Sequence, residues 1–392
     1  MNKKKLLFIV DKIENGGAER QMLKIAKLYR DNFEIEVMSI YPPSKDMLEQ
    51  LEALSFTYIQ VSSNSNNSNK LSMIWAFYKT LKRRLIQQDF KAVFSFLEWS
   101  NVLTTKALLK SGKRESVQLI LNVRNYLSNQ YESKSGLKLK VAKSILKKYY
   151  NLADKVLCNS NAIKQDLKDN FYIKAEKIEV IYNSLDHKTL KIDAAKHIEF
   201  TTDKLNFVTC GRLAPQKQLK SLLLTFHQYN RELKNNDHLY VIGSGPQQNE
   251  LEELIKEKKI NATLVGHKSN VAAWFNHADC FVLNSYFEGF PNVLAEAIAL
   301  GTYSIVADCL SGPREIMTDF QEVDYKKQLP DVFETHLGVL YRCEYSNEEN
   351  KSLFNALVQY REKILTHDRS LVRSKLMNEN FGVNEWRKVL DQ

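Results

Sequence analysis

The sequence is poor in glycine and proline and has no long hydrophobic run. Its 392 residues include only 13 Gly and 7 Pro, which excludes a collagen-like repeat and a low-complexity disordered chain. With 44% hydrophobic and 26% charged residues, the composition is that of a globular protein. At about 100 to 200 residues per domain, the length corresponds to two domains or one large one.

Because no window offers the roughly 18 apolar residues that a membrane-spanning helix needs, we expect no membrane crossing. The first apolar run, Leu6 to Val10, is shorter than the core of a secretory signal peptide, which has about 7 to 15 residues. A short run of this kind is typical of a buried strand.

The sequence also lacks the residue patterns of several kinds of site. The cysteines are odd in number, widely spaced and mostly set in apolar runs, which favours reduced thiols in a cytosol over a disulfide framework. They are Cys158, Cys210, Cys280, Cys309 and Cys343. There is no Asp-x-Asp and no paired-His spacing, so we expect no divalent-metal site. A Gly-x-Ser-x-Gly elbow is missing as well, which gives hydrolase chemistry no support.

The net charge of +10 is concentrated in the first half of the chain. Residues 1–190 carry 32 Lys and Arg against 19 Asp and Glu, a balance of +13, whereas residues 191–392 carry 24 against 27, a balance of −3. Two segments, Lys79 to Lys91 and Lys134 to Lys148, are dense in cations. No aromatic-interleaved basic ribbon accompanies them, so we do not expect a nucleic-acid partner.

The second of these segments has the pattern of a basic amphipathic helix. Apolar residues recur near helical spacing while lysines occupy other angles. The apolar residues are Leu137, Val141, Ile145 and Leu146, and the lysines are Lys138, Lys143, Lys147 and Lys148. Such a helix can lie on an anionic membrane surface. A solvated helix whose apolar face is buried in the core explains the pattern equally well, and both interpretations stay open.

Short β-branched or aromatic runs alternate with longer amphipathic stretches along the chain, which predicts α/β domains with parallel sheets covered on both faces. The predicted strands are Leu6–Val10, Ile35–Ile40, Thr57–Val61, Ala92–Phe96, Gln118–Val123, Lys155–Cys158, Ile178–Ile181, Asn206–Cys210, His238–Ile242, Ala262–Val265, Cys280–Leu283 and Tyr303–Val306. Because Ser184 to Lys204 is polar with little periodicity, we place the hinge between two doubly wound domains there. Ligands of such sheets bind at the carboxyl ends of the strands.

Several strand ends carry residues suited to binding an anion. Gly16 and Gly17 precede the first predicted helix, whose free amides can bind a phosphate, although two glycines alone are better explained by a structural turn. Arg212 and Lys217 leave one strand into one loop, where two cations can converge on a diphosphate unless both are solvated at the surface. Gly243 to Gly245 is a second glycine-bearing strand end.

The segment from Asn284 to Ala297 is the most informative. A predicted strand ends before it, and Pro291 is suited to the first turn of a helix. Gly289 and Phe290 then form a strand-to-helix elbow with free amides at Gly289, Phe290, Asn292 and Val293. Glu288 precedes the helix and Glu296 lies inside it, and a carboxylate beside an anion-binding elbow is suited to binding the hydroxyls of a sugar or ribose. Ser311 to Glu315 is another loop at this edge, whose charges are also explained by exposure at the surface.

Four of these segments resemble the retaining glycosyltransferases of family 4, which have the GT-B fold. They are Gly16 to Arg20, Gly211 to Leu213 with Lys217, Gly243 to Pro246, and Glu288 followed by Glu296 in a Glu-x7-Glu motif. The resemblance covers nearly the whole chain. It implies two Rossmann-like domains facing across a cleft. Their expected bounds are 1–190 for acceptor binding, 191–204 for a linker, 205–375 for nucleotide-sugar binding and 376–392 for a helix that crosses back to the first domain.

The resemblance also implies roles for particular residues. Glu288 would contact the transferred sugar and Glu296 the ribose, while Arg212 and Lys217 would neutralise the diphosphate. Gly17 would let the first helix approach the phosphate, and Gly266 and His267 would border the base. The other residues expected at the donor are Gly16, Gly211, Gly243, Gly245, Gly289, Phe290, Pro291, Asn292 and Val293.

One position departs from the family pattern. Many members have a His after the strand that corresponds to Gln118–Val123, whereas this chain has Arg124. Arginine cannot act as a base at neutral pH, but it can stabilise a departing phosphate or bind a sugar hydroxyl. We therefore expect a catalytic role for Arg124. Glu98, Trp99 and Asn125 are expected to bind the acceptor, although Trp99 is also explained as a packing residue.

These residues and the resemblance lead to a first hypothesis, a retaining, metal-independent glycosyltransferase. It would move one sugar from a nucleotide-sugar, with UDP as the expected nucleotide, to a glycan or polyprenyl-diphosphate-linked acceptor. The reaction would belong to bacterial surface polysaccharide synthesis. We expect no cofactor besides the nucleotide-sugar co-substrate, and a location in the cytoplasm or on the cytosolic face of the membrane. A GT-B nucleotide-sugar epimerase is a second hypothesis. A non-catalytic sugar-nucleotide sensor or subunit is a third, because the family His is missing.

Overall fold

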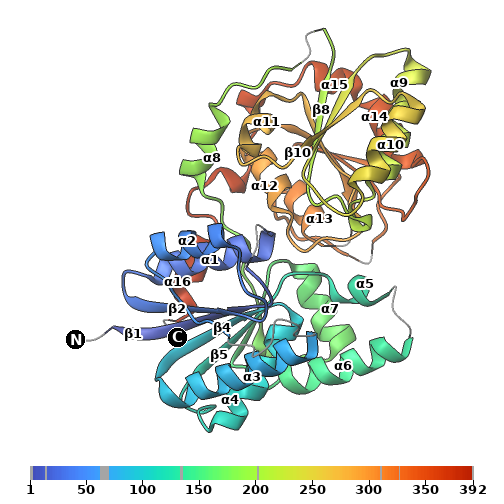
Figure 1. Cartoon of the computed structure of the whole chain (residues 1–392). Coiled ribbons are helices and arrows are strands. Elements are labelled where there is room, and N and C mark those ends of the chain that lie inside the picture. The colour runs from blue at the N-terminus through green and yellow to red at the C-terminus, as the bar shows by residue number, and fades with distance from the viewer. Residues whose placement is uncertain are drawn as a thin grey trace. The chain divides into compact units, whose positions relative to one another are not determined.

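The computed structural model describes residues 3–13, 16–61, 70–132, 136–200, 203–309, 311–325 and 327–390. The chain divides into two compact units (Figure 1). The first unit consists of Met1–Asn183 and Gly382–Gln392, and the second of Ser184–Phe381. Each unit contains a seven-stranded sheet with helices on its faces, so the α/β class expected from the alternating pattern is confirmed.

The sheet of the first unit is parallel throughout, in the order β3-β2-β1-β4-β5-β6-β7. Its strands are β1 (Lys4–Val10), β2 (Phe33–Ser39), β3 (Thr57–Tyr58), β4 (Phe90–Phe96), β5 (Gln118–Val123), β6 (Lys155–Cys158) and β7 (Ile178–Val180). The helices are α1 (Gly17–Tyr29), α2 (Lys45–Ala53), α3 (Lys70–Gln87), α4 (Glu98–Ser111), α5 (Leu127–Glu132), α6 (Gly136–Tyr150), α7 (Asn161–Phe171) and α16 (Val383–Lys388).

Alternating side chains of each strand enter two separate apolar cores, as the period of a β-strand requires. In β1, Leu7 and Ile9 pack under α3, α4, α6 and α7, whereas Leu6, Phe8 and Val10 pack under α1, α2 and α16. Both faces of the sheet are therefore covered, which explains why the sequences of the central strands are continuous apolar runs.

The last helix, α16, belongs to the first unit although it lies more than 190 residues after Asn183 in the sequence. Figure 1 shows it in red beside the blue α1. Trp386 is fully buried, its indole N–H donates to the carbonyl of Tyr182 at 3.3 Å, and its own carbonyl accepts from the Tyr29 hydroxyl. This large side chain fixes the end of the chain to the first sheet.

The second sheet has the order β10-β9-β8-β11-β12-β14-β13. Its strands are β8 (Asn206–Cys210), β9 (His238–Ile242), β10 (Ala262–Gly266), β11 (Cys280–Leu283), β12 (Tyr303–Asp308), β13 (Val332–Thr335) and β14 (Gly338–Arg342). The helices are α8 (His187–Ala194), α9 (Leu219–Leu233), α10 (Gln248–Lys258), α11 (Val271–His277), α12 (Asn292–Ala299), α13 (Gly312–Met317), α14 (Lys351–Gln359) and α15 (Arg361–Leu365). Within the described ranges, no helix is both long and apolar enough to cross a bilayer.

The sequence did not predict the two strands β13 and β14. β14 extends the parallel sheet beside β12, and β13 pairs antiparallel to β14 at the edge. β13 is only partly buried and contains Glu334, so it lacks the apolar run that marks the central strands. The tight connection depends on Gly338, whose φ is +137°.

Part of the segment that we expected to be a linker, 191–204, is helical. Helix α8 begins after Asp186, whose carboxylate accepts from the Thr189 amide at 3.1 Å, a common N-cap arrangement. Leu190 and Ala194 pack against Ala272 of α11. The helix was overlooked because it is short and buries only a few residues. The units divide between Asn183 and Ser184.

We predict that Gly338→Ala destabilises the second unit. An added Cβ atom would lie 2.0 Å from the carbonyl oxygen of Ser304, at a φ that other residues rarely adopt. The free energy of unfolding should fall by about 2 to 4 kcal/mol in urea titration. The matched control is Gly136→Ala in α6, where a Cβ would meet nothing within 4 Å; equal loss in both variants would contradict the prediction.

Candidate functional site

Four loops meet at the carboxyl edge of the second sheet, where the predicted donor residues lie. They follow β8, β9, β11 and β12. The first two loops are joined by backbone hydrogen bonds from Gly211 to Ile242 and from Leu213 to Ser244, each of 3.0 Å. The last two are joined by a bond of 2.9 Å from the Gly312 amide to the Gly289 carbonyl. Segments far apart in the sequence thus form one continuous edge.

The predicted glycines let these loops pack against one another. A Cβ atom on Gly243 would lie 1.9 Å from the carbonyl oxygen of Gly211, and one on Gly245 would lie 2.4 Å from that of Leu213. On the other side, a Cβ on Gly312 would lie 2.3 Å from the oxygen of Gly289. Contacts this short with backbone atoms leave no room for a side chain at these positions. The packing of the loops therefore accounts for the glycines without any role in ligand binding.

An ion pair joins the first and third loops. The ammonium of Lys217 lies 2.5 Å from a carboxylate oxygen of Glu288, and the two side chains are only 17% and 11% exposed. Gln216 holds the same loops together, because its carbonyl accepts from the Tyr286 amide at 2.8 Å and its side chain donates to Phe287 at 2.6 Å. The structure therefore brings together two predicted catalytic residues that are 71 positions apart.

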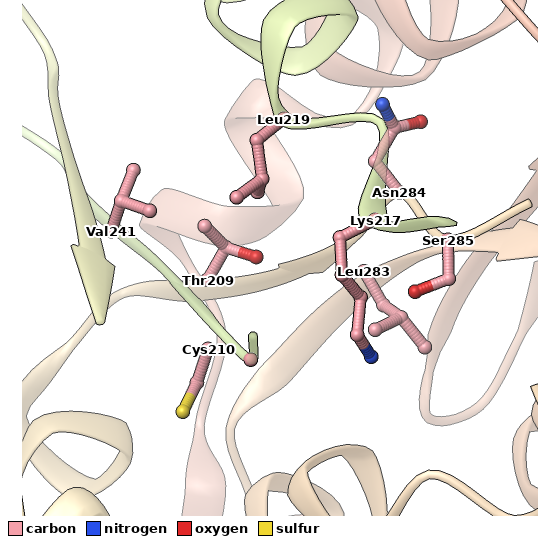
Figure 2. Close-up of a pocket in the computed structure, with 9 residues that line it drawn as sticks. Thr209, Cys210, Lys217, Leu219, Val241, Leu283, Asn284 and Ser285 are labelled. Carbon is pink, nitrogen blue, oxygen red and sulfur yellow. The ribbon is translucent and has the colours of Figure 1, made fainter. Parts of the chain in front are cut away.

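A small pocket opens at this edge (Figure 2). It is lined by Thr209, Cys210, Gly211, Lys217, Leu219, Val241, Leu283, Asn284 and Ser285. In Figure 2 the side chains of Lys217, Leu283 and Ser285 lie opposite Val241. The lining combines one cation with hydroxyl, amide and aliphatic groups. The pocket has room for about one water molecule, so it marks the cation-bearing wall of the edge and does not enclose a ligand.

The predicted elbow lies between β11 and α12. Pro291 is the residue before the helix rather than in its first turn, with φ −73°, and its carbonyl accepts from the amides of Leu294 and Ala295 at 3.1 Å each. Asn292 and Val293 open the helix, where amides lack partners within the helix and carry partial positive charge. Glu296 lies half-buried in the middle of α12, and Phe290 is buried.

Three other predicted donor residues are less enclosed. Arg212 is exposed, and no ion pair or side-chain hydrogen bond from it is found among the described residues. Gly266 ends β10 with φ +76°, and its carbonyl accepts from the Gly243 amide at 2.9 Å. His267 follows it and is exposed. Arg212 is thus a cation available to a ligand rather than part of the internal network.

The charges of the loop after β12 are buried, so the surface interpretation of this segment is wrong. Arg314 and Glu315 are 2% and 1% exposed. The Arg314 guanidinium forms a two-point ion pair with Asp308 and donates to the carbonyls of Asp324 and Lys327. Arg314 therefore anchors the loop from inside, which is what a planar guanidinium with five donors is suited to do.

In the first unit, Arg124 follows β5 and is almost completely buried. It is 5% exposed, and its guanidinium lies between the rings of Phe96 and Trp386, 5.3 Å from each centroid. One nitrogen donates to the Asn183 side chain at 2.9 Å, while Nε and Nη2 have no partner among the described residues. Burial lowers the pKa of Arg124 to about 9, which still leaves it charged at neutral pH.

The predicted acceptor residues surround the start of α4. Leu97 has φ +73° and ψ 159°, a combination that is essentially restricted to glycine and costs about 1 to 3 kcal/mol. This turn directs Glu98 inward, where it is 8% exposed and accepts from the Gln130 amide at 3.3 Å. Trp99 is 65% exposed, so the packing interpretation of Trp99 is wrong. Asn125 is half-buried beside Arg124.

Two groups near Glu98 were missed in the sequence. Asp11, at the end of β1, accepts from the amide and hydroxyl of Ser100, and burial raises its pKa. Burial, with further contributions from Glu98 and Asp11, raises the pKa of Tyr131 to about 12. An acidic residue directly after the first strand was a usable signal for Asp11. Tyr131 had none, because only the fold brings it to Glu98.

The start of α1 holds the two predicted glycines of the first unit. Gly16 precedes the helix, and its carbonyl accepts from the Arg20 amide at 3.1 Å. A Cβ atom on Gly16 would lie 2.2 Å from a carboxylate oxygen of Glu19. Gly17 is the first helical residue and is exposed. The first helical turn therefore contains a buried carboxylate besides its free amides, a feature that the glycines alone did not indicate.

Across the ranges that the structure describes, no group of three or more His, Cys, Asp or Glu side chains is arranged to hold a metal ion. All five cysteines are free thiols.

Comparison with known proteins identifies the family. Residues 15–189 match the family model described as Glycosyltransferase Family 4, and residues 191–330 match the model described as Glycosyl transferases group 1. An uncharacterized glycosyltransferase of Methanocaldococcus jannaschii is 27% identical over 84% of this chain and 80% of its own length.

A second relative, from Campylobacter jejuni, is 27% identical over 80% of this chain and 84% of its own length. Its name is N-acetylgalactosamine-N,N'-diacetylbacillosaminyl-diphospho-undecaprenol 4-alpha-N-acetylgalactosaminyltransferase. Among solved structures, Anabaena Alr3699/HepE in complex with UDP-glucose aligns over 99% of both chains with a TM-score of 0.73 and 18% identity. The chain therefore belongs to the glycosyltransferases and has the GT-B fold, with a family 4 domain followed by a group 1 domain.

Proposed function

We propose that the protein is a retaining, metal-independent glycosyltransferase that moves one sugar from a UDP-sugar to a glycan or polyprenyl-diphosphate-linked acceptor in bacterial surface polysaccharide synthesis. The observation that carries the proposal is the Lys217–Glu288 pair beside the N-terminus of α12. The name of the Campylobacter relative supports a lipid-linked acceptor, and the UDP-glucose complex of HepE supports the donor. We place the reaction at the cytosolic face of the membrane.

In the proposed reaction, the bond between the sugar C1 and the diphosphate oxygen breaks while an acceptor hydroxyl oxygen bonds to C1 on the same face. The leaving diphosphate takes the electron pair of the broken bond and the proton of the acceptor hydroxyl. Lys217, Arg212 and the first amides of α12 stabilise its growing negative charge. Groups fixed in advance at such a position contribute about 3 to 4 kcal/mol each, and a metal ion is not needed for this neutralisation.

The two carboxylates of the Glu-x7-Glu motif have different surroundings, which suits different roles. Glu288 is paired with Lys217 at 2.5 Å and can accept from hydroxyls of the transferred sugar with its other oxygen. Glu296 lies half-buried within α12, where we assign it to the ribose hydroxyls. Because like charges repel, the Glu296 carboxylate can lie beside an anion-binding site only if it faces the ribose hydroxyls and not the phosphates.

In the first unit, Arg124 is assigned to the reacting groups and Glu98, Trp99 and Asn125 to the acceptor. Arg124 has two buried nitrogens, Nε and Nη2, without a partner in the described part of the chain, a costly state that a phosphate or sugar oxygen would relieve. Its side chain is held by Phe96 and Trp386, and because both nitrogens are buried, a ligand would reach them only if neighbouring side chains move. Glu98 can accept from an acceptor hydroxyl.

The first test is turnover with a panel of UDP-, GDP- and ADP-sugars and an extract of lipid-linked glycans. We expect one nucleotide class to add a single sugar mass to an acceptor, with the anomeric configuration retained by NMR and the rate unchanged in EDTA. Nucleotide-sugar binding without any transfer would favour the sensor hypothesis. An inverted product or loss of activity in EDTA would contradict the mechanism.

We predict that Lys217→Ala lowers kcat about 100- to 1000-fold, the loss typical for one removed charge-stabilising donor. The fold should persist, because Gln216 still joins the two loops. The matched control is Lys220→Ala: Lys220 lies nearby on α9 and pairs with Glu250 at 3.6 Å, but is more exposed. Steady-state kinetics that show equal losses in both variants would refute the role of Lys217.

We also predict that Glu296→Gln weakens binding of the nucleotide diphosphate. The substitution keeps the side-chain volume and replaces the carboxylate that accepts hydrogen bonds from the two ribose hydroxyls. The binding free energy should therefore weaken by about 1.5 to 3 kcal/mol, or roughly 10- to 150-fold in Kd. Calorimetry with the nucleotide diphosphate measures this directly. The control is Glu252→Gln on α10, which changes an exposed carboxylate and should leave the affinity unchanged. An unchanged affinity in Glu296→Gln would show that the ribose assignment is incorrect.

A further inference from the structure

Helix α6 exposes an apolar stripe that the core does not use. Leu137, Val141 and Ile145 are 74%, 51% and 40% exposed, and their spacing of four residues places them on one face of the helix. Leu146 and Tyr150, on the opposite face, supply the buried contacts. The interpretation of this helix as a solvated helix with a buried apolar face is therefore wrong for these three residues.

Lysines surround the α6 stripe. Lys140, Lys147 and Lys148 are exposed. Lys148 lies close to Val141 on the helix surface, whereas Lys140 and Lys147 lie on the flank, about 100 to 120° away. Lys143 is different, because it is half-buried with its ammonium 5.7 Å from the ring of Phe171. The exposed surface of α6 thus combines three aliphatic side chains with one lysine on the stripe and two lysines beside it.

Helix α3 repeats this arrangement. Leu71, Trp75 and Ile86 are 75%, 56% and 51% exposed. They cluster on one side of the helix, away from the buried Phe77 and next to the buried Leu85. The ammonium of Lys79 lies 5.0 Å from the ring of Trp75. Trp75 also stacks on Tyr78 with 5.7 Å between the ring centroids, but more than half of its side chain stays exposed.

Helix α4 contacts both α3 and α6. It adds the exposed Lys106 and Lys110; the Lys106 ammonium lies 5.6 Å from the ring of Tyr78. The sequences of α3 and α6 contain no Asp or Glu. The three helices therefore form one basic, apolar surface, which we call the α3–α4–α6 surface.

We propose that the α3–α4–α6 surface binds the anionic surface of a lipid bilayer. Aliphatic side chains and a tryptophan can enter the boundary between head groups and acyl chains while lysines remain at the phosphates. Each cation near an anionic bilayer strengthens binding about fivefold. This is a surface for reversible attachment, since no helix within the described ranges can cross a bilayer. It involves helices outside the donor site and does not depend on the transfer reaction.

A nucleic acid fits the surface less well. Its phosphates would bind the lysines, but three aliphatic side chains in a row offer nothing to a phosphate backbone. A bilayer satisfies both the charge and the apolar stripe at once. This difference separates the two partners in experiment, because only lipid binding should depend on Leu137, Val141 and Ile145.

The test is sedimentation of the full chain with phosphatidylcholine vesicles that contain either no anionic lipid or about one third phosphatidylglycerol. We expect binding to the anionic vesicles and little to the neutral ones. Lys140→Gln/Lys147→Gln/Lys148→Gln should weaken binding about 100-fold, three steps of fivefold. Leu137→Ser/Val141→Ser/Ile145→Ser should weaken it at least about tenfold, the loss of one buried aliphatic group.

Two variants of the second unit are matched controls. Lys256→Gln/Lys258→Gln/Lys259→Gln removes three exposed lysines near the end of α10, and Ile192→Ser/Leu365→Ser/Leu371→Ser removes three exposed aliphatic side chains. Both should bind anionic vesicles as the unaltered chain does. Circular dichroism checks that each variant is folded, and Trp75→Ala gives an independent variant on α3.

The absence of vesicle binding, equal binding to neutral vesicles, or equal losses in the control variants would each overturn the proposal. Binding of duplex RNA or DNA that is lost with the lysines and unaffected by the aliphatic variant would overturn it in favour of nucleic acid. Transfer to a water-soluble acceptor separates this proposal from the proposed function, because the surface variants should retain it. If that transfer is absent from the unaltered chain while vesicles are bound, only the proposed function fails.

Discussion

The ion pair between Lys217 and Glu288 is the contact on which the candidate donor site depends. It joins loops that follow two different strands, at 2.5 Å and largely out of water. A buried pair gains little net stability, because each charge loses its hydration, but removal of one partner leaves the other uncompensated. The pair is thus better explained by function than by stability. It holds a cation where negative charge can develop, and a diphosphate that reaches Lys217 would free Glu288 for hydroxyls.

The backbone around this pair leaves little room for variation. Gly243 and Gly312 allow neighbouring loops to approach within contacts that a Cβ atom would block. Arg314 is anchored to Asp308 behind the loop that supports the elbow. Rigid loops are what a preorganised site requires, since donors that must move into position lose part of their effect. Lys217 and Glu288 therefore lie in a scaffold that is fixed by glycine packing and a second, structural ion pair, while Arg212 is the exposed cation of the site.

The sequence alone predicted the central strands and the loops at their carboxyl ends, because buried parallel strands are continuous apolar runs and motif residues follow them directly. It did not predict β13, which lies at the sheet edge and is only partly buried, or α8, whose buried face consists of a few residues. It also could not show that Arg124 is enclosed, since Trp386 lies 262 positions away. In each case the deciding contact is with a distant segment, whereas periodicity reports only on neighbours. The roles assigned to Arg124, Glu98 and Glu296 remain predictions.

The orientation of α6 is a further property that the sequence pattern could not determine. Its sequence contains Leu137, Val141, Ile145 and Leu146 close to one stripe, and periodicity does not decide whether this stripe faces the core or the surface. In the fold only Leu146 is buried, because the helix rests on the sheet through that residue and Tyr150. The three others are exposed at an energetic cost that folding does not repay, and Leu71 and Trp75 of α3 add to the same cost. Helices α3 and α6 contain ten Lys and Arg residues and no Asp or Glu, although Arg84 is paired with Glu36 and Lys143 is half-buried. The exposed cations offset only part of the cost of leaving apolar area in water. The surface becomes favourable once a negatively charged apolar phase covers it, and this is the physical reason to infer a bilayer at this surface rather than a further protein core.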